Sequence, residues 1–284
     1  MDNMTDITVR NELLIDSKQL EHRLGDEATL IVFVGSEAVF NAGHIPNSVH
    51  ISPSELTCGI PPAVGKLPSI DKLTTLFRRI GLTEDSQLIA YDDEGGGWAG
   101  RLIWTLDVIG HAHYQYLDGG LHRWQAEKRP LEDSSDSSWP AHSDYQVTVQ
   151  SELLVTAECI INGLSAEQIH IWDARSAQEH HGEKVLADRG GCIPGAANID
   201  WLELIDHNRA LQLKPLPLIK QMMDEAGLDG SKKIITHCQT HHRSGLSYLV
   251  GKLLGMPIAA YDGSWSEWGN RSDTPIDNKT LTTL

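Results

Sequence analysis

The stretch from residue 234 to residue 245 is the part of the chain best suited to covalent chemistry. An apolar run ends at Cys238, and the turn after it leads into an expected helix that starts near Arg243. The residues of this loop are Cys238, Gln239, Thr240, His241, His242, Arg243 and Ser244. Backbone N–H groups of such a turn and the positive end of the helix both stabilise an anion on sulfur. Most free cysteines are buried for packing, but this setting indicates a nucleophile.

Size and charge limit the classes of protein to which the chain can belong. Its 284 residues suit two domains better than one. A formal net charge of −16 argues against binding to nucleic acid or to an anionic membrane, which need a broad basic surface. An anionic small molecule must therefore be met by local donors.

Cysteine use and the terminal residues predict a cytoplasmic location. Residues 1–6 are polar and acidic and lack the features of a signal peptide, and no run is as long as a membrane-spanning helix. The four cysteines are too few and too scattered for a disulfide framework. We therefore expect a reducing compartment.

The two halves of the chain repeat the same order of elements. The paired expected elements are strands at 30–34 and 169–173, helices around 70–80 and 218–226, strands at 87–91 and 233–237, and helices at 98–109 and 243–254. Strands that alternate with helices predict two α/β domains, each a mainly parallel sheet flanked by helices.

A stretch rich in Ser, Asp and Pro separates the halves and predicts a linker. We expect a first domain over residues 1–130, a linker over 131–144 and a second domain over 145–284. The repeat aligns Asp92 with Cys238. Because a carboxylate cannot take up and pass on a sulfur atom, we expect the first domain to be catalytically inactive and the second to hold the single active centre.

With both halves aligned, the chain resembles the tandem-domain rhodaneses, the thiosulfate and 3-mercaptopyruvate sulfurtransferases. The motifs that carry the resemblance lie at 40–46, 192–196, 238–243 and 261–268. The resemblance implies two tandem rhodanese-like domains, only the second of them active, with no cofactor and no metal. Cys192 stands where the family turn usually has histidine, as His44 does in the first half, and we expect it to be a packing substitution.

The expected chemistry is a two-step transfer of sulfane sulfur. The Cys238 thiolate attacks the outer sulfur of a donor such as thiosulfate, and cyanide or a thiol then removes the sulfur from the resulting persulfide. We expect Arg243 to fix the loop and to add positive potential. Thr240 and Ser244 are expected to donate hydrogen bonds to the anion or to cap the helix.

Family resemblance also implies that Asp173 and Arg175 lie beside the loop and brace or line it; the alternative is a surface ion pair at a strand end. For His241 and His242 two interpretations stand side by side. Partly protonated rings would attract an anionic donor, or else one or both rings point to solvent.

The donor is open at this stage. The loop lacks the basic residues that directly follow the cysteine in well-studied thiosulfate enzymes, and it is not the small glycine-rich loop of mercaptopyruvate enzymes. Thiosulfate is favoured, with a mercaptopyruvate sulfurtransferase and a persulfide carrier to a protein thiol as alternatives. The expected partners are small-molecule donors and acceptors, and we expect a monomer.

Two remoter alternatives use the same residues. Cysteine-dependent phosphatases place five residues between cysteine and arginine, whereas four separate Cys238 from Arg243, so the loop favours a single sulfur atom over a tetrahedral phosphate. A zinc site is suggested by His237, Cys238, His241 and His242, but zinc motifs usually separate their ligand pairs by a longer stretch.

Overall fold

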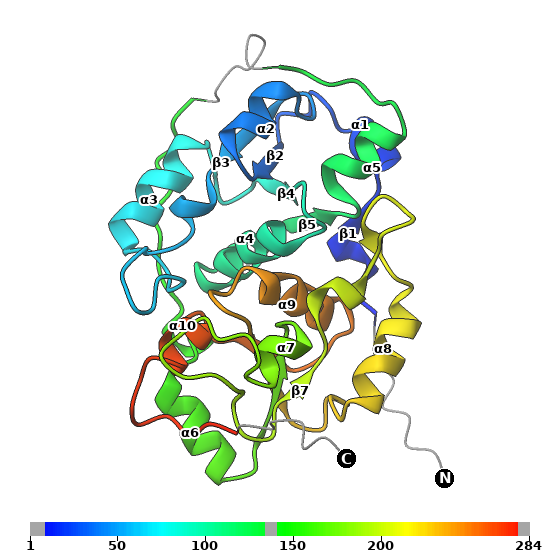
Figure 1. Cartoon of the computed structure of the whole chain (residues 1–284). Coiled ribbons are helices and arrows are strands. Elements are labelled where there is room, and N and C mark those ends of the chain that lie inside the picture. The colour runs from blue at the N-terminus through cyan, green and yellow to red at the C-terminus, as the bar shows by residue number, and fades with distance from the viewer. Residues whose placement is uncertain (1–8, 134–140, 278–284) are drawn as a thin grey trace.

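Two parallel sheets form the centres of two α/β domains in the computed structural model, which describes residues 9–133 and 141–277 (Figure 1). The first sheet has the order β1-β5-β4-β2-β3 and the second the order β11-β10-β6-β7. The first sheet consists of β1 (Leu14–Ile15), β2 (Thr29–Val34), β3 (Ser48–Ile51), β4 (Gln87–Tyr91) and β5 (Tyr114–Leu117). The second consists of β6 (Ile169–Asp173), β7 (Ala197–Asn198), β10 (Lys233–His237) and β11 (Ile258–Ala260). A separate antiparallel pair joins β8 (Ile205–Asp206) to β9 (Gln212–Leu213).

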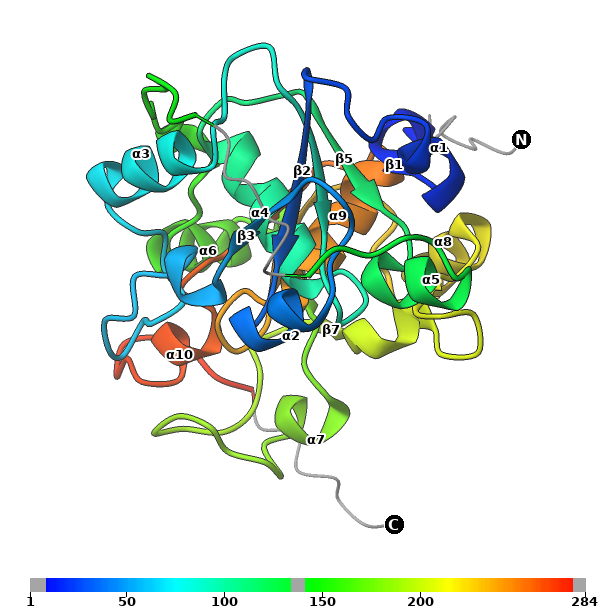
Figure 2. The ribbon, with the colours of Figure 1, turned by 90° about the horizontal axis from the view of Figure 1, so that it is seen from above.

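Helices cover both faces of each sheet. In the first domain they are α1 (Ser17–Glu21), α2 (Glu37–Ala42), α3 (Ile70–Arg79), α4 (Gly97–Val108) and α5 (Gly120–Ala126). In the second they are α6 (Ala157–Ser165), α7 (Ala177–His180), α8 (Leu216–Glu225), α9 (Arg243–Leu253) and α10 (Ser264–Trp268). Short 3₁₀ turns cover Asn11–Leu13, Pro53–Glu55, Ser151–Leu153 and Trp201–Leu204. Seen from above, α4 and α9 lie between α3 and α6 on one side and α1, α5 and α8 on the other (Figure 2).

The alternation of side chains along β2 decides which helices each face receives. Ile31 and Phe33 pack in one cluster with residues of α1, α2 and α5, whereas Val32 and Val34 pack in a second cluster with α3 and α4. That second cluster continues into α8 and α9 of the other domain. One apolar core therefore crosses the boundary between the domains.

The closest helix contact in this shared core is between α4 and α9. A methyl group on Gly100 would lie 2.3 Å from the carbonyl oxygen of Gly245, and one on Gly245 would lie 2.4 Å from that of Gly97. Only glycine allows the two backbones to approach so closely. Because α9 directly follows the Cys238 loop, this contact brings the first domain against that loop (Figure 1).

The repeated pattern predicted three of the main strands with the bounds that the structure has, and β2 and the two central helices to within one residue. The structure differs at two apolar positions of the predicted helix faces. Ile70 and Leu218 are 50% and 45% exposed, because each lies in the first turn of its helix, before the buried stripe begins.

Residues 134–140 of the expected linker lie outside the described residues. The segment at 141–150 is extended and runs beside α3. Its hydrogen bonds are with the first domain, because the carbonyl of Tyr145 accepts one from Arg78 and the N–H of Gln150 donates one to the carbonyl of Val108.

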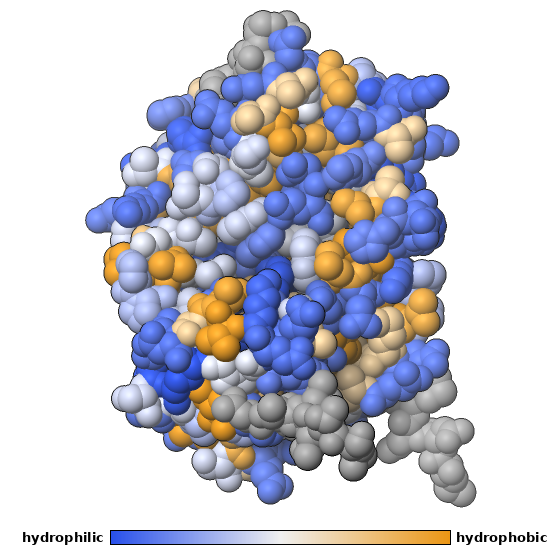
Figure 3. Space-filling view, in the orientation of Figure 1, coloured by the Kyte–Doolittle hydropathy of each residue, from blue (hydrophilic) through white to orange (hydrophobic). Residues whose placement is uncertain are grey.

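Polar residues dominate the face shown in Figure 3, and apolar residues appear there in small groups. Within the described ranges 9–133 and 141–277, none of the helices has the length and apolar character needed to cross a bilayer.

Candidate active site

Cys238 lies at the carboxyl end of β10, where the central strand of the second sheet turns into α9. Ligand sites of open parallel sheets lie at this edge. The cysteine is only 1% exposed, so its sulfur is enclosed by the loop and by its neighbours.

Contacts with α10 set the direction of the loop backbone. The N–H groups of Trp265 and Ser266 donate to the carbonyls of Cys238 and Gln239, each over 2.9 Å. The N–H of Cys238 donates to the hydroxyl of Ser264 over 3.3 Å. Because these carbonyls face α10, the N–H groups farther along the loop are free to face the sulfur.

Three donors surround the sulfur of Cys238: the N–H of Thr240, the N–H of Ser244 and the hydroxyl of Ser244. Burial favours the neutral thiol, but the charge of Arg243 and these hydrogen bonds outweigh it. The pKa of Cys238 therefore lies below its ordinary value. The first turn of α9 adds its own positive end.

His241 is fully buried, and its Nδ1 lies 2.8 Å from the hydroxyl of Ser244. Because that hydroxyl gives its hydrogen to sulfur, Nδ1 of His241 carries the hydrogen and donates to it. Burial, with the charge of Arg101, holds the pKa of His241 well below its ordinary range, so the ring is neutral. The interpretation of His241 as a solvent-facing ring is wrong, because the ring is buried, and its lowered pKa argues against the other interpretation, a protonated attractor.

His242 bridges the two domains. Its Nε2 lies 2.8 Å from Oε2 of Glu94, and its ring stacks on Trp98 with 4.2 Å between centroids. The side chain is 21% exposed, so it lies at the rim of the loop rather than pointing freely into solvent. Whether His242 attracts a donor stays a prediction.

Arg243 is held by Glu179, a residue that the sequence analysis did not single out. Its two terminal nitrogens donate to the two carboxylate oxygens of Glu179 over 2.7 and 2.8 Å. Although burial opposes ionisation, the hydrogen bond from Arg243 lowers the pKa of Glu179 to about 2. The signal in the sequence was the spacing from Ser176 to Glu179, a capping box that starts α7 and fixes this carboxylate.

Asp173 and Arg175 form a buried pair under the loop instead of a surface ion pair. Nε and Nη2 of Arg175 donate to the two oxygens of Asp173 over 2.9 and 2.6 Å, and Nδ1 of His180 lies 2.9 Å from Asp173. The Arg175 guanidinium also stacks over Trp265 of α10. Despite burial, these neighbours and His237 hold the pKa of Asp173 well below its ordinary value.

The first domain supplies one wall of the site. A methyl group on Gly65 would lie 2.3 Å from the carbonyl oxygen of Thr240, so the segment around Gly65 rests directly on the loop. Lys66 pairs with Glu267 over 2.6 Å, and the N–H of Leu67 donates to Asp262 over 2.8 Å. Gln239 is tied elsewhere, to the carbonyl of Leu186.

The comparison with protein families decides the relationship of the chain to known proteins. The model of the rhodanese-like domain matches it twice, over residues 16–127 and 156–271. The chain belongs to the rhodanese family. A thiosulfate sulfurtransferase of Azotobacter vinelandii is 44% identical to this rhodanese, over 93% of the chain and 97% of the relative.

More distant relatives of this rhodanese have other names. The sulfur carrier protein TtuD of Thermus thermophilus is 29% identical, over 93% of the chain and 96% of the relative. A 3-mercaptopyruvate sulfurtransferase of Escherichia coli is 29% identical, over 83% of each chain. Among solved structures, an EanB variant in complex with ergothioneine matches with a TM-score of 0.85 and 17% identity, over 95% of this chain and 70% of that one. This last likeness concerns the fold alone.

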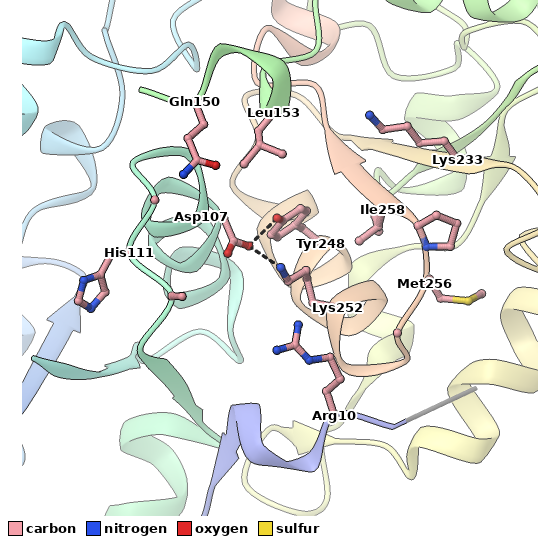
Figure 4. A pocket seen from close by; sticks show the side chains of 14 residues that line it. Arg10, Asp107, His111, Gln150, Leu153, Lys233, Tyr248, Lys252, Met256 and Ile258 are labelled. Carbon is pink, nitrogen blue, oxygen red and sulfur yellow. Dashed lines mark hydrogen bonds and ion pairs between the residues drawn. The ribbon is translucent and has the colours of Figure 1, made fainter. Parts of the chain in front are cut away.

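The rhodanese has a hollow of about 570 Å³ at the opposite end of α4 and α9 from Cys238 (Figure 4). There Asp107 of α4 accepts a hydrogen bond from the Tyr248 hydroxyl over 2.6 Å and pairs with Lys252 over 3.0 Å, both on α9. These contacts fasten the two helices together far from the chemistry.

The described part of the rhodanese contains no group of three or more His, Cys, Asp or Glu side chains placed to hold a metal ion. The histidines near Cys238 are engaged separately, with His237 beside Asp173, His241 on Ser244 and His242 beside Glu94. Cys192 is fully buried, and its N–H donates to Asp277.

Proposed function

We propose that this rhodanese is a thiosulfate sulfurtransferase that works through a persulfide on Cys238. The observation that carries the proposal is the set of three hydrogen-bond donors aimed at the sulfur, together with the Arg243 charge that lowers the pKa of the thiol. This environment favours an anion of one sulfur atom, whether thiolate or terminal persulfide sulfur.

In the first step the Cys238 thiolate attacks the outer sulfur of thiosulfate. A new S–S bond forms on the enzyme, the S–S bond of thiosulfate breaks, and its electron pair leaves with sulfite. The negative charge moves to the outer sulfur of the persulfide. In the second step cyanide attacks that sulfur, thiocyanate leaves, and the Cys238 thiolate returns, so the kinetics are ping-pong.

The remaining loop residues have supporting roles in this proposal. Arg243, held by Glu179, supplies the charge beside the sulfur, and Thr240 and Ser244 supply hydrogen bonds. Asp173 and Arg175 brace the loop from below through α10. Gln239 and His242 form its rim.

Thiosulfate is the favoured donor because the 44% identical relative with that activity aligns over nearly its whole length. The 29% identical mercaptopyruvate enzyme supports that donor less strongly. A protein thiol is a second candidate acceptor, since one relative, which aligns with this chain over 96% of its own length, is a sulfur carrier protein.

We keep the domains proposed from the repeat, 1–130 and 145–284 with a linker at 131–144; the two matches to the family model, 16–127 and 156–271, fall one within each domain. We further propose that the protein acts as a cytoplasmic monomer, without nucleic acid or membrane partners. No disulfide joins its cysteines, and the apolar core shared by the domains already covers the largest helix faces.

Intact-mass measurement after incubation with each donor tests the proposal. Wild type should gain the mass of one sulfur atom from thiosulfate and lose it to cyanide, and Cys238→Ser should gain none. A larger gain from mercaptopyruvate would reassign the donor. The same gain on Cys238→Ser would contradict the mechanism.

A further inference from the structure

Arg101 of α4 is a fully buried guanidinium from the domain that lacks the nucleophile. Its Nη2 donates to the carbonyl of Leu56 over 2.7 Å, and its Cζ lies 4.6 Å from the centre of the Trp104 ring. These contacts fix its position but do not neutralise its charge.

Two of its nitrogens, Nε and Nη1, have no hydrogen-bond partner within the described ranges, and no carboxylate there lies within 4.0 Å of it. Arg175 shows the usual solution, since it is equally buried but makes a two-point pair with Asp173. A buried charge without a counterion is costly. The charge of Arg101 therefore calls for an anion nearby.

The surroundings of Arg101 are those of the Cys238 loop. The rings of Trp104 and His241 are perpendicular with 4.7 Å between centroids, and the Gly100 backbone touches Gly245. Burial lowers the pKa of Arg101 to about 10, while the negative charges of Asp262, Cys238 and Cys58 oppose that shift.

We propose that Arg101 is a positioning residue of the sulfur chemistry: its buried guanidinium, seated on Trp104 against the active-site loop, is a countercharge that keeps Cys238 anionic. The proposal deepens the proposed function, on which its catalytic meaning rests. It gives the domain without a nucleophile an electrostatic part in the reaction.

Asp262 is the competing anion. Its carboxylate accepts the N–H of Leu67, lies beyond 4.0 Å from Arg101, and has a pKa raised by burial even though Arg101 opposes that rise. Arg243 on α9 acts directly on Cys238, whereas Arg101 interacts with Cys238, with Asp262 after β11, with Cys58 in the covering segment and with the His241 ring. His237, the residue before Cys238, interacts with Asp173 and Arg175. Arg175 is paired with Asp173 and Arg243 with Glu179, so within the described residues Arg101 is the cation of this set that has no carboxylate within 4.0 Å.

The test is the pH dependence of Cys238 alkylation by iodoacetamide, followed by mass measurement of the peptide that contains it. Arg101→Gln keeps a donor for Leu56 and loses the charge, and Arg101→Lys keeps the charge. We expect the thiol pKa to rise by about one unit in Arg101→Gln, so that alkylation near pH 7 slows about tenfold. Arg101→Lys should restore most of the rate.

Arg129→Gln is the matched control, because Arg129 also stacks over a tryptophan, Trp124, but pairs with Glu21 and Glu127. Its alkylation profile should equal that of wild type. A folded Arg101→Gln with an unchanged profile would overturn the proposal and assign Asp262 as the counterion. Loss of folding in both Arg101 variants would overturn it in favour of a packing role.

Alkylation does not require sulfur transfer. Failure of this test is therefore distinguishable from failure of the proposed function, which the mass gain from thiosulfate reports.

Discussion

The carboxylate of Asp92 and the sulfur of Cys238 occupy matching places in two related loops. Oδ1 of Asp92 accepts hydrogen bonds from the N–H groups of Glu94, Gly95 and Gly96, at 3.1, 3.1 and 2.9 Å, and Oδ2 accepts one from Ala99 at 2.9 Å. The first domain thus keeps the anion-binding loop but fills it with its own side chain. That loop has no room for a substrate anion.

Asp92→Asn should destabilise the protein by about 2–4 kcal/mol, because one oxygen becomes an amide that faces backbone N–H groups. Urea unfolding measures the loss, and turnover by the folded protein should change little. Asp93→Asn is the control and should cost less than about 1 kcal/mol. Equal losses in the two variants would show that the Asp92 loop is not a special anion site.

Glu179→Gln should lower kcat/KM for thiosulfate about tenfold, because the amide no longer holds Arg243 in a two-point charged pair. Stopped-flow measurement of persulfide formation isolates the affected step. Glu183→Gln, an exposed carboxylate on the same segment, should behave as wild type. A reduced rate in both variants would show that the loss of a negative charge, and not the loss of the ion pair with Arg243, slows the reaction.

Gly65→Ala should displace the active-site loop, because the new methyl group would lie 2.3 Å from the carbonyl oxygen of Thr240. We expect a stability loss of about 1–3 kcal/mol and a clear fall in kcat. Val64→Ala removes atoms at the neighbouring position and should keep most activity. Steady-state kinetics together with thermal unfolding compare the two variants. Wild-type activity in Gly65→Ala would show that the segment around Gly65 can shift without disturbing the active-site loop.

Stability should fall as the pH drops below about 6.5. Burial lowers the pKa of His237 to about 4. Burial also holds the pKa of His241 well below its ordinary value. Between 6.5 and these values the unfolded chain binds protons that the folded protein does not, which costs up to about 1.4 kcal/mol per pH unit for each histidine.

His241→Asn should therefore flatten the pH dependence of the free energy of unfolding below pH 6.5 and leave it unchanged above. Asparagine tolerates the left-handed backbone at this position, where φ is 57°. His207→Asn, at an exposed site, is the control. Urea unfolding at pH 7, 6 and 5 measures the slopes, and identical slopes for wild type and His241→Asn would contradict the expectation.

Sequence periodicity predicted the strands and central helices because those elements are fixed by local alternation of apolar residues. It also located Cys238, since the turn between strand and helix lies within one short stretch. Glu179 was missed as a partner of that turn because it lies 64 positions from Arg243, and Arg101 was missed because it reaches the turn only through Trp104, whose ring meets His241 of the other domain. No local pattern encodes such distances.

His241 shows the same limit of prediction from the sequence. A histidine after a cysteine in a polar turn suggests solvent and charge, but His241 is buried because its left-handed backbone turns the ring inward against Trp104. Only the packing of α4 on the loop supplies that wall.

The glycine contact of α4 with α9 also limits how substrate reaches the buried sulfur. Gly100 and Gly245 are in backbone contact near one end of α4 and α9, and Asp107 pairs with Lys252 near the other, so the two helices are joined at both ends. A hinge motion that separates the two domains would have to break both of these contacts. We therefore expect substrate to reach Cys238 through displacement of the segment around Gly65, which rests on the loop, rather than through separation of the domains.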